Sequence, residues 1–157
     1  MTFRYRLRVR YGECDAQKIV YNARYGEYVD LAATEFLRAV WGDAMFGGGY
    51  DYRLVKQVLE WKAGARWDDV VEIAVSATRI GTTSFVLGME LGVLGAAGPA
   101  VVAETTYVVV GEQSQTKLAI PDDLRATLAA GAAGVIVDHA GSDAAPRGAA
   151  SGGTDQK

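Results

Sequence analysis

Asp15 is the residue whose position best suits acyl-transfer chemistry. It lies between a strand-like segment and a long helical pattern, next to Cys14 and shortly before Ile19 and Val20. Partly apolar surroundings disfavour the charged form of a carboxyl group, which makes the group a better base or nucleophile. The first backbone N–H groups of the following helix have no intrahelical partner, so they can stabilise an oxyanion. On spacing alone, the simpler reading is favoured, in which Asp15 only closes a turn before the helix.

The chain lacks the residues that other common catalytic arrangements require. There is one histidine, His139, and it lies in a weakly patterned C-terminal segment, which argues against Ser-His-Asp and Cys-His catalysis. The single cysteine, Cys14, excludes an intramolecular disulfide and a cysteine-based zinc site, and it reads most simply as a small buried residue. A single histidine also excludes a histidine-rich metal site, and no glycine-rich phosphate-binding motif is present, so we expect no cofactor.

Composition limits the classes of protein to consider. The chain has 157 residues, 50% of them hydrophobic and 22% charged, which favours one globular domain. Its formal charge of -3, from 16 basic and 19 acidic residues, argues against a dedicated nucleic-acid binder. No apolar run approaches the roughly 18 residues needed to span a bilayer, and the first residues have no hydrophobic signal core. We therefore expect a cytoplasmic protein.

A single long helix is predicted from Asn22, as the N-cap, to Gly42. Gly42 is a natural stop, since glycine readily adopts the backbone conformation that ends helices. Apolar residues recur at spacings of three and four along this segment, which is the pattern of one buried helix face. These residues are Tyr25, Tyr28, Val29, Ala32, Phe36 and Val40.

The remaining pattern predicts strands over residues 3–11, 54–63, 70–80, 84–94 and 100–110, and a short helix from Pro121 to Leu128. This order favours an α+β fold, a five-stranded antiparallel sheet with one long helix on one face. Residues 1–130 form the domain. Residues 131–157 are expected to be a low-complexity, disordered tail. The outer face of the first strand carries four arginines, expected to face solvent, with phosphates or a second subunit as alternatives: Arg4, Arg6, Arg8 and Arg10.

A resemblance to a known family adds to this reading. The stretch YGECDAQKIVYNARY, residues 11–25, resembles the opening motif of the 4-hydroxybenzoyl-CoA thioesterase family, which includes the Tol–Pal-associated acyl-CoA thioesterases. The block LEWKAGARWDD, residues 59–69, is similar to the strand-and-turn signature of that family. Residues 81–85 and the pair Ile120-Pro121 match weaker landmarks. The resemblance covers about residues 4–128.

The resemblance implies a hotdog fold, in which an antiparallel sheet wraps a long helix. It implies that two subunits join their sheets and form active sites at their interface, so we expect a homodimer or a homotetramer. It also implies that Asp15 is the catalytic carboxylate, either as nucleophile or as general base. The backbone N–H of Asn22 matches the group that polarises the thioester carbonyl. Tyr21 and Tyr25 match positions that line the site, although both could be ordinary core aromatics.

Two departures from the family pattern concern the site. Many relatives carry histidine where this chain has Asn22, and asparagine can hydrogen-bond but cannot act as an acid or base. Relatives often place arginine or lysine near the turn at residues 81–84, where CoA phosphates bind. Here Arg79 and Thr83 are the candidate substrate-binding residues, together with backbone N–H groups. An exposed Arg79 could also serve only solubility.

The function expected from this reasoning is hydrolysis of a short-chain or aromatic acyl-CoA thioester, with an acyl-carrier-protein ester as a second substrate form. The alternative is a non-catalytic acyl-thioester binding protein on the same fold. A dehydratase is set aside because the folded region contains no histidine. Four aromatic residues could line an acyl pocket or simply fill the core: Phe46, Tyr50, Trp61 and Trp67.

Overall fold

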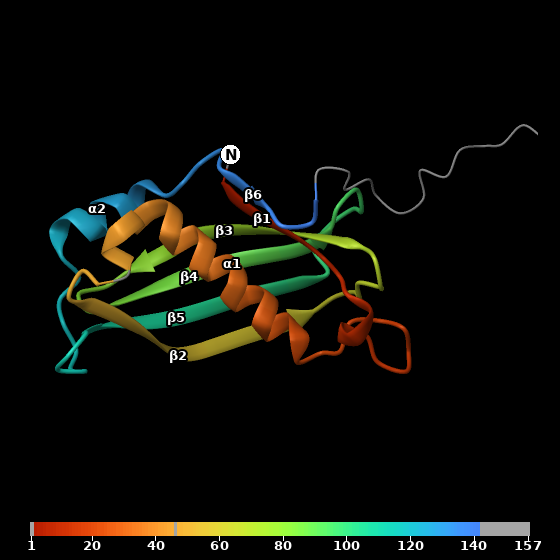
Figure 1. Ribbon diagram of the computed structural model, residues 1–157, viewed down its shortest axis with the longest axis horizontal. Coiled ribbons are helices and arrows are strands. Elements are labelled where there is room, and N and C mark those ends of the chain that lie inside the picture. Colours follow the sequence, from red (N-terminus) through yellow and green to blue (C-terminus); the bar gives the residue numbers. More distant parts are fainter. Residues whose placement is uncertain (1, 46, 142–157) are drawn as a thin grey trace, which may run out of the picture.

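The fold is one long helix lying across a curved sheet (Figure 1). The structure is a computed structural model and describes residues 2–45 and 47–141. In this part of the chain, no helix is both long enough and apolar enough to pass through a bilayer. The helices and strands are β1 (Phe3–Arg8), α1 (Arg24–Trp41), β2 (Tyr50–Trp61), β3 (Val70–Ile80), β4 (Ser84–Val93), β5 (Val101–Gly111), α2 (Asp122–Ala130) and β6 (Ile136–Asp138), with short 3-10 helices at Tyr11–Glu13 and Gly42–Met45.

The sheet has six strands in the order β2-β5-β4-β3-β1-β6. The first five pair antiparallel, as the sequence predicted, but β6 pairs parallel with β1 and makes the sheet mixed. The expectation of five antiparallel strands was therefore wrong. The sixth strand comes from the segment that we had assigned to a disordered tail. Residues 142–157 of that segment lie outside the described residues, so disorder there stays a prediction.

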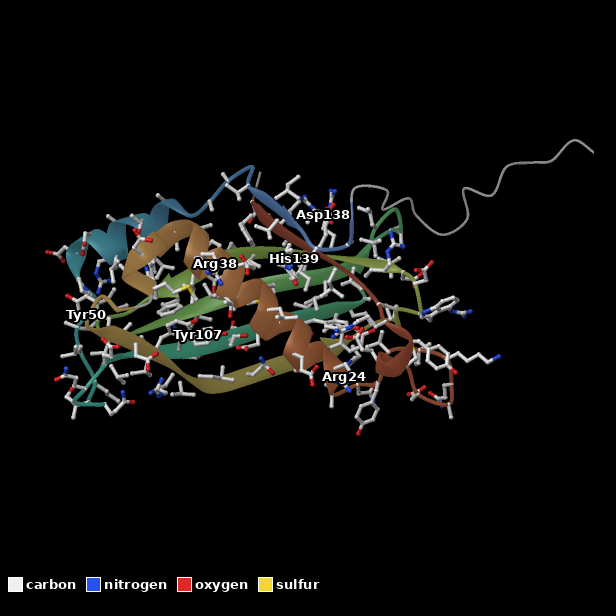
Figure 2. The ribbon with its side chains drawn as sticks, in the orientation of Figure 1. Arg24, Arg38, Tyr50, Tyr107, Asp138 and His139 are labelled. Atoms are coloured by element: carbon white, nitrogen blue, oxygen red, sulfur yellow. The ribbon has the colours of Figure 1, made fainter. Side chains whose placement is uncertain are left out.

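A few contacts hold β6 against β1 although it is only three residues long. The Arg4 N–H donates to the Val135 carbonyl at 3.0 Å, and the His139 N–H donates to the Arg6 carbonyl at 2.8 Å. The ring of His139 packs edge-on against Tyr5, whose hydroxyl lies 3.1 Å from Nδ1 (Figure 2). The only histidine of the chain is thus part of a strand-to-strand contact.

The helix α1 begins one residue later than predicted. The N-cap position is Ala23, and Asn22 makes no capping hydrogen bond. The reason is a tight turn that precedes the helix, in which the Arg24 N–H donates to the Tyr21 carbonyl at 2.8 Å. The predicted end is confirmed, because α1 stops at Trp41 and Gly42 has a φ of 54°.

The core lies between α1 and the inner face of the sheet. The helix residues predicted from the spacing are buried there, apart from Val40, which packs at the edge of the core. An aromatic cluster fills one end: the Phe85 and Tyr107 rings stack with centroids 5.3 Å apart, and Trp41 meets Phe85 edge-on at 5.4 Å. Figure 2 shows Tyr107 on the sheet beneath α1. Aromatic burial of this kind contributes strongly to core stability.

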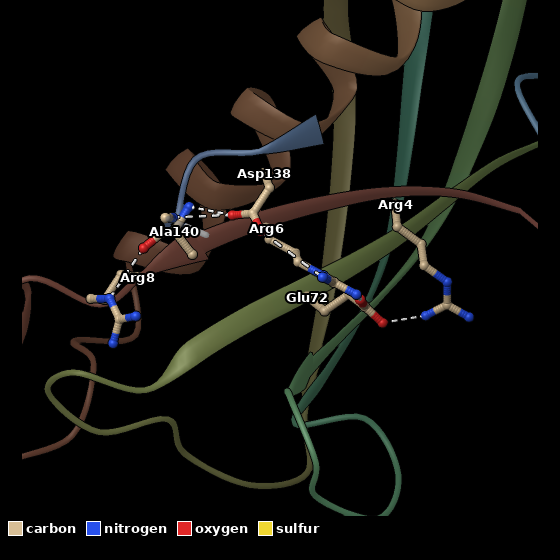
Figure 3. A network of polar contacts seen from close by, with 7 residues as sticks. Arg4, Arg6, Arg8, Glu72, Asp138 and Ala140 are labelled. Atoms are coloured by element: carbon tan, nitrogen blue, oxygen red, sulfur yellow. Dashed lines mark hydrogen bonds and ion pairs between the residues drawn. The ribbon is translucent and has the colours of Figure 1, made fainter. Parts of the chain in front are cut away.

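Arg4 and Arg6 of the first strand form ion pairs with Glu72 (Figure 3), and Arg8 forms one with Asp68. Arg4 and Arg6 both bind the carboxylate of Glu72 on β3, and Arg6 donates from Nε at 2.7 Å. Arg8 donates from Nε to the Ala140 carbonyl at 3.2 Å. These side chains therefore bind groups of their own chain, and the alternative of a free arginine face for phosphates finds no support.

Glu72 should be the central residue of this surface network. Its side chain is 15% exposed and holds two guanidinium groups at once, so Glu72→Gln removes the charge that lets them lie side by side. We expect a loss of about 1–2 kcal/mol in the free energy of unfolding, measured by urea denaturation. Glu104→Gln is the matched control, because Glu104 is exposed on β5 and forms no ion pair within the described ranges. Equal stability of the two variants would contradict this role.

Candidate functional site

The loop of residues 13–21, here called the Asp15 loop, is a small hairpin between β1 and α1. Cys14 and Val20 form an antiparallel bridge, and the Asp15 N–H donates to the Ile19 carbonyl at 2.9 Å. The returning arm is held by the chain before β3, because the Val20 N–H donates to the Ala65 carbonyl at 2.8 Å. This pairing places Asp15 near the hairpin tip, opposite Ile19, at one end of the sheet (Figure 1).

Glu13 anchors the base of this loop. Its carboxylate is 5% exposed and accepts from the Arg10 backbone at 2.7 Å, from the Arg10 guanidinium at 2.8 Å and from the Tyr28 hydroxyl at 2.8 Å. Burial acts to raise the pKa of Glu13, but these three donors outweigh it and hold the pKa below its ordinary value. Burial and the bond to Glu13 raise the pKa of Tyr28. The carboxylate thus connects the end of β1 with α1.

The side chain of Asp15 is half-buried and faces a cavity of about 360 Å³. Its Oδ1 accepts from the Gln17 N–H at 2.8 Å, which is the turn-closing role considered for it. Its second oxygen accepts no hydrogen bond from the described residues and can still act on a ligand. This space, here called the Asp15 cavity, is lined by Tyr11, Cys14, Asp15, Lys18, Arg66 and Trp67.

Asn22 belongs to a different cavity. The backbone N–H groups of Asn22 and Ala23 donate to no atom in the described part of the chain, so two free donors do stand just before α1. Asn22 lines a second space of about 270 Å³, here called the Asn22 cavity. Within one chain, Asp15 and Asn22 therefore line different cavities. The Asn22 cavity is lined by Ile19, Val20, Asn22 and Tyr25 and by Trp61–Gly64.

The two predicted tyrosines behave differently. Tyr25 is 1% exposed, and its hydroxyl accepts from the Ala65 N–H at 2.9 Å, so it fixes the loop that walls the Asn22 cavity. Burial raises the pKa of this hydroxyl, which keeps it a neutral group. Tyr21 is 55% exposed on the surface before α1 and lines neither of the two cavities.

Arg79 and Thr83 lie at the other end of the sheet in the same chain. The Asp15 cavity lies at the start of β3, whereas Arg79 is nine residues further along that strand, which spans roughly 30 Å. Arg79 is exposed. Sequence reasoning missed Arg125 of α2, whose Nη2 donates to the Gly81 carbonyl at 2.7 Å and so fixes this turn. No local pattern around Arg125 could have indicated a contact 44 residues away.

The predicted aromatic residues do not form one pocket. Trp67 lines the Asp15 cavity and Trp61 lines the Asn22 cavity, and these rings are 53% and 49% exposed. Tyr50 lies at the opposite end of the sheet, far from Arg24 at the start of α1 (Figure 2). Phe46 lies outside the described residues. Arg66 and Lys18 are the charged lining residues that the sequence analysis had not singled out.

Comparisons with known proteins agree with one another. A family model described as the thioesterase-like superfamily matches residues 9–128. The acyl-CoA thioester hydrolase YbgC of Escherichia coli O6:H1 is 35% identical over 91 residues, which is 57% of this chain and 68% of that protein. A solved structure from Pseudomonas aeruginosa strain PAO1 superposes with a TM-score of 0.75 at 24% identity, covering 81% of this chain and 89% of the other. A hypothetical protein from Aquifex aeolicus gives 0.72 at 26% identity, covering 80% and 98%.

Glu13 should make stability depend on pH. Because its folded pKa is lowered, its contribution is complete above the ordinary value of 4.5 and is lost as pH falls through the folded pKa. Glu13→Gln should therefore cost about 2 kcal/mol in the free energy of unfolding at pH 7. The difference from the unmodified protein should shrink below pH 4.5. Urea denaturation at pH 7, 5 and 3 measures both effects.

Glu27→Gln provides the control for this series. Glu27 also pairs with an arginine three residues away, but its side chain is 58% exposed, so its loss should change stability little at any of these pH values. A Glu13→Gln penalty that stayed constant down to pH 3 would contradict the role given to the buried charge.

Proposed function

The chain belongs to the thioesterase-like superfamily and is a thioesterase, and from this premise we propose that Asp15 drives hydrolysis of a short-chain or aromatic acyl-CoA. The single observation that carries the proposal is the Asp15 carboxylate, half-buried in a cavity with one oxygen free of hydrogen bonds from the described residues. A cytoplasmic location, expected from the sequence, accords with this substrate.

The chemistry requires one base or nucleophile and one set of donors. Asp15 either removes a proton from water as the water attacks the thioester carbonyl, or attacks the carbonyl itself and is released by water from the resulting anhydride. In both routes the carbon–sulfur bond breaks and CoA leaves as a thiol. The oxyanion that forms on the carbonyl oxygen requires N–H donors, and Asn22 and Ala23 offer two free ones. Removal of one such donor typically costs roughly 3–4 kcal/mol of transition-state stabilisation.

The open edge of the sheet supports an active site shared by two chains. The strand β2 is the long edge of the sheet and pairs only with β5 among the described strands. It exposes a row of apolar side chains, which is typical of an edge that pairs with another chain. We propose that two copies join through β2 and form a homodimer. The exposed side chains are Leu54, Val55, Val58 and Trp61.

Two-fold pairing of this kind would also explain the distant candidates. Antiparallel joining of two β2 strands sets the Tyr50 end of one copy beside the Trp61 end of the other. Because Trp61 lines the Asn22 cavity, that cavity would be closed by the second copy. The turn that contains Thr83, and Arg79 before it, lies at the Tyr50 end and would approach the site from the second copy. Both residues thus remain candidates for binding CoA.

The sizes of the two cavities favour a small acyl group. Ligand sites run roughly 300–1,000 Å³, so a volume of about 360 Å³ is near the lower end of this range and one of about 270 Å³ is just below it. Trp67 and Trp61 provide one exposed aromatic wall in each. We therefore expect benzoyl-CoA and short-chain esters to be hydrolysed with a higher kcat/KM than palmitoyl-CoA. A non-catalytic binding role is favoured by no observation on the described residues.

Asp15→Asn tests the catalytic assignment. The amide cannot take a proton from water or form an anhydride, so we expect kcat for benzoyl-CoA to fall at least about 100-fold with little change in KM. Thiol release, followed with a thiol reagent, measures both constants. Asp68→Asn is the control, because Asp68 is another loop carboxylate at this end of the sheet, is half-exposed and pairs with Arg8. Equal thiol release by Asp15→Asn and the unmodified protein would point to the binding role instead.

Val58→Asp tests the dimer. A buried negative charge at the proposed β2 contact should give a monomer by analytical ultracentrifugation, and hydrolysis should fall with it. Val135→Asp is the matched control: Val58 and Val135 are both 41% exposed, but Val135 lies beside β6 at the other edge of the sheet. A dimer that survives Val58→Asp as well as Val135→Asp would contradict pairing through β2.

A further inference from the structure

Lys18 has a backbone conformation that glycine adopts without strain and lysine does not. Its φ is 62°, in the left-handed region, and its N–H donates to the Asp15 carbonyl at 2.9 Å to close the loop tip. Asparagine and aspartate tolerate this region because their short side chains can bond locally, whereas the long lysine side chain gains nothing from the turn. A strained backbone at a cleft is often retained for what its side chain does there.

The side chain of Lys18 lines the Asp15 cavity together with Arg66. Neither cation forms an ion pair or a side-chain hydrogen bond with the residues that the structure describes. The arginines of β1 differ in this respect, because Arg4, Arg6 and Arg8 all have carboxylate partners. Two unpaired cations beside one carboxylate leave the cavity with an excess of positive charge.

We propose that Lys18, assisted by Arg66, binds an anionic group of the thioester substrate in the Asp15 cavity. This inference rests on the proposed function and makes Lys18 a specificity-determining residue of that site. The shared chemistry is a phosphate or a carboxylate, both of which ammonium and guanidinium groups bind through charge-assisted hydrogen bonds. The anion is either a phosphate of CoA or a carboxylate carried by the acyl group. The exposed ring of Trp67 lines the same cavity and offers a surface for the attached organic part.

Lys18→Gly separates this role from a structural one, because the two predict opposite changes. Glycine relieves the left-handed backbone, so the midpoint of thermal unfolding should stay the same or rise. Loss of the ammonium should raise KM for the anionic substrate at least about tenfold while kcat stays within about twofold. Lys18→Arg keeps a cation and should keep the low KM. Lys18→Asn tolerates the same backbone without the charge and should repeat the effect of glycine.

Gln115→Gly is the matched backbone control. Gln115 has a φ of 54° in the turn after β5, and it lines neither cavity at the Asp15 end. Its replacement should leave KM and kcat unchanged for every substrate. A parallel rise in KM in Gln115→Gly would assign the effect to backbone change and would overturn the proposal.

Three substrates distinguish the sources of the anion. Benzoyl-CoA carries phosphates only, benzoyl-pantetheine carries neither group, and succinyl-CoA carries both phosphates and an acyl carboxylate. A KM rise for benzoyl-CoA but not for benzoyl-pantetheine identifies a phosphate as the anion. A rise confined to succinyl-CoA identifies the acyl carboxylate. No rise for any of the three, in both Lys18→Gly and Lys18→Asn, would overturn the proposal.

Binding measured without turnover separates this inference from the proposed hydrolysis. Quenching of tryptophan fluorescence by benzyl-CoA, a thioether that cannot be hydrolysed, and by its succinate-bearing analogue gives dissociation constants for each variant. Weaker binding of either ligand to Lys18→Gly supports the inference even if Asp15→Asn retains full thiol release. Unchanged binding of both ligands contradicts the inference while leaving the role of Asp15 to its own test.

Discussion

The buried carboxylate of Glu13 holds together the three segments that define the candidate site. It accepts hydrogen bonds from the backbone N–H and the guanidinium of Arg10, shortly after β1, and from the hydroxyl of Tyr28 on α1. Its own backbone carbonyl accepts from the Tyr21 N–H at 2.9 Å, which closes the base of the Asp15 loop. A buried charge is tolerated only when it is fully bonded, so this arrangement allows little freedom at the base of the loop. The position of Asp15 follows from it.

Much of the fold could be predicted because local patterns there agree with tertiary packing. The buried residues of α1 recur at helical spacing, and Gly42 ends the helix where the pattern stops. Strands β2 to β5 alternate or are β-branched, and their turns contain glycine and aspartate. β6 could not be found in this way. It has three residues in a segment rich in alanine and glycine, and it is held by contacts to β1 that no local pattern records.

The candidate site was predictable only in its parts. Residue types pointed to Asp15 and to N–H donors before α1, but not to the bridge between Cys14 and Val20 or to the separate cavities that Asp15 and Asn22 line. The left-handed backbone conformation of Lys18 could not be predicted either, because φ at this loop tip depends on the hydrogen bond to Asp15 and not on the lysine itself. Single-chain geometry also leaves Arg79 distant. Properties that arise from pairing across a loop, or between copies, are not encoded in any short window of sequence.

The short strand β6 has a consequence for how many copies can assemble. β6 pairs with the outer edge of β1 at residues 4–6, so the outward backbone groups of β1 there already form hydrogen bonds within the chain. At the other edge of the sheet, the outward backbone groups of β2 pair with none of the described strands. A protein with two open sheet edges can polymerise edge to edge without limit, as filaments do. The edge opposite β2 is β6, and an edge strand of only three residues offers little for another chain to pair with. Edge-to-edge pairing of the proposed kind would therefore stop after one partner.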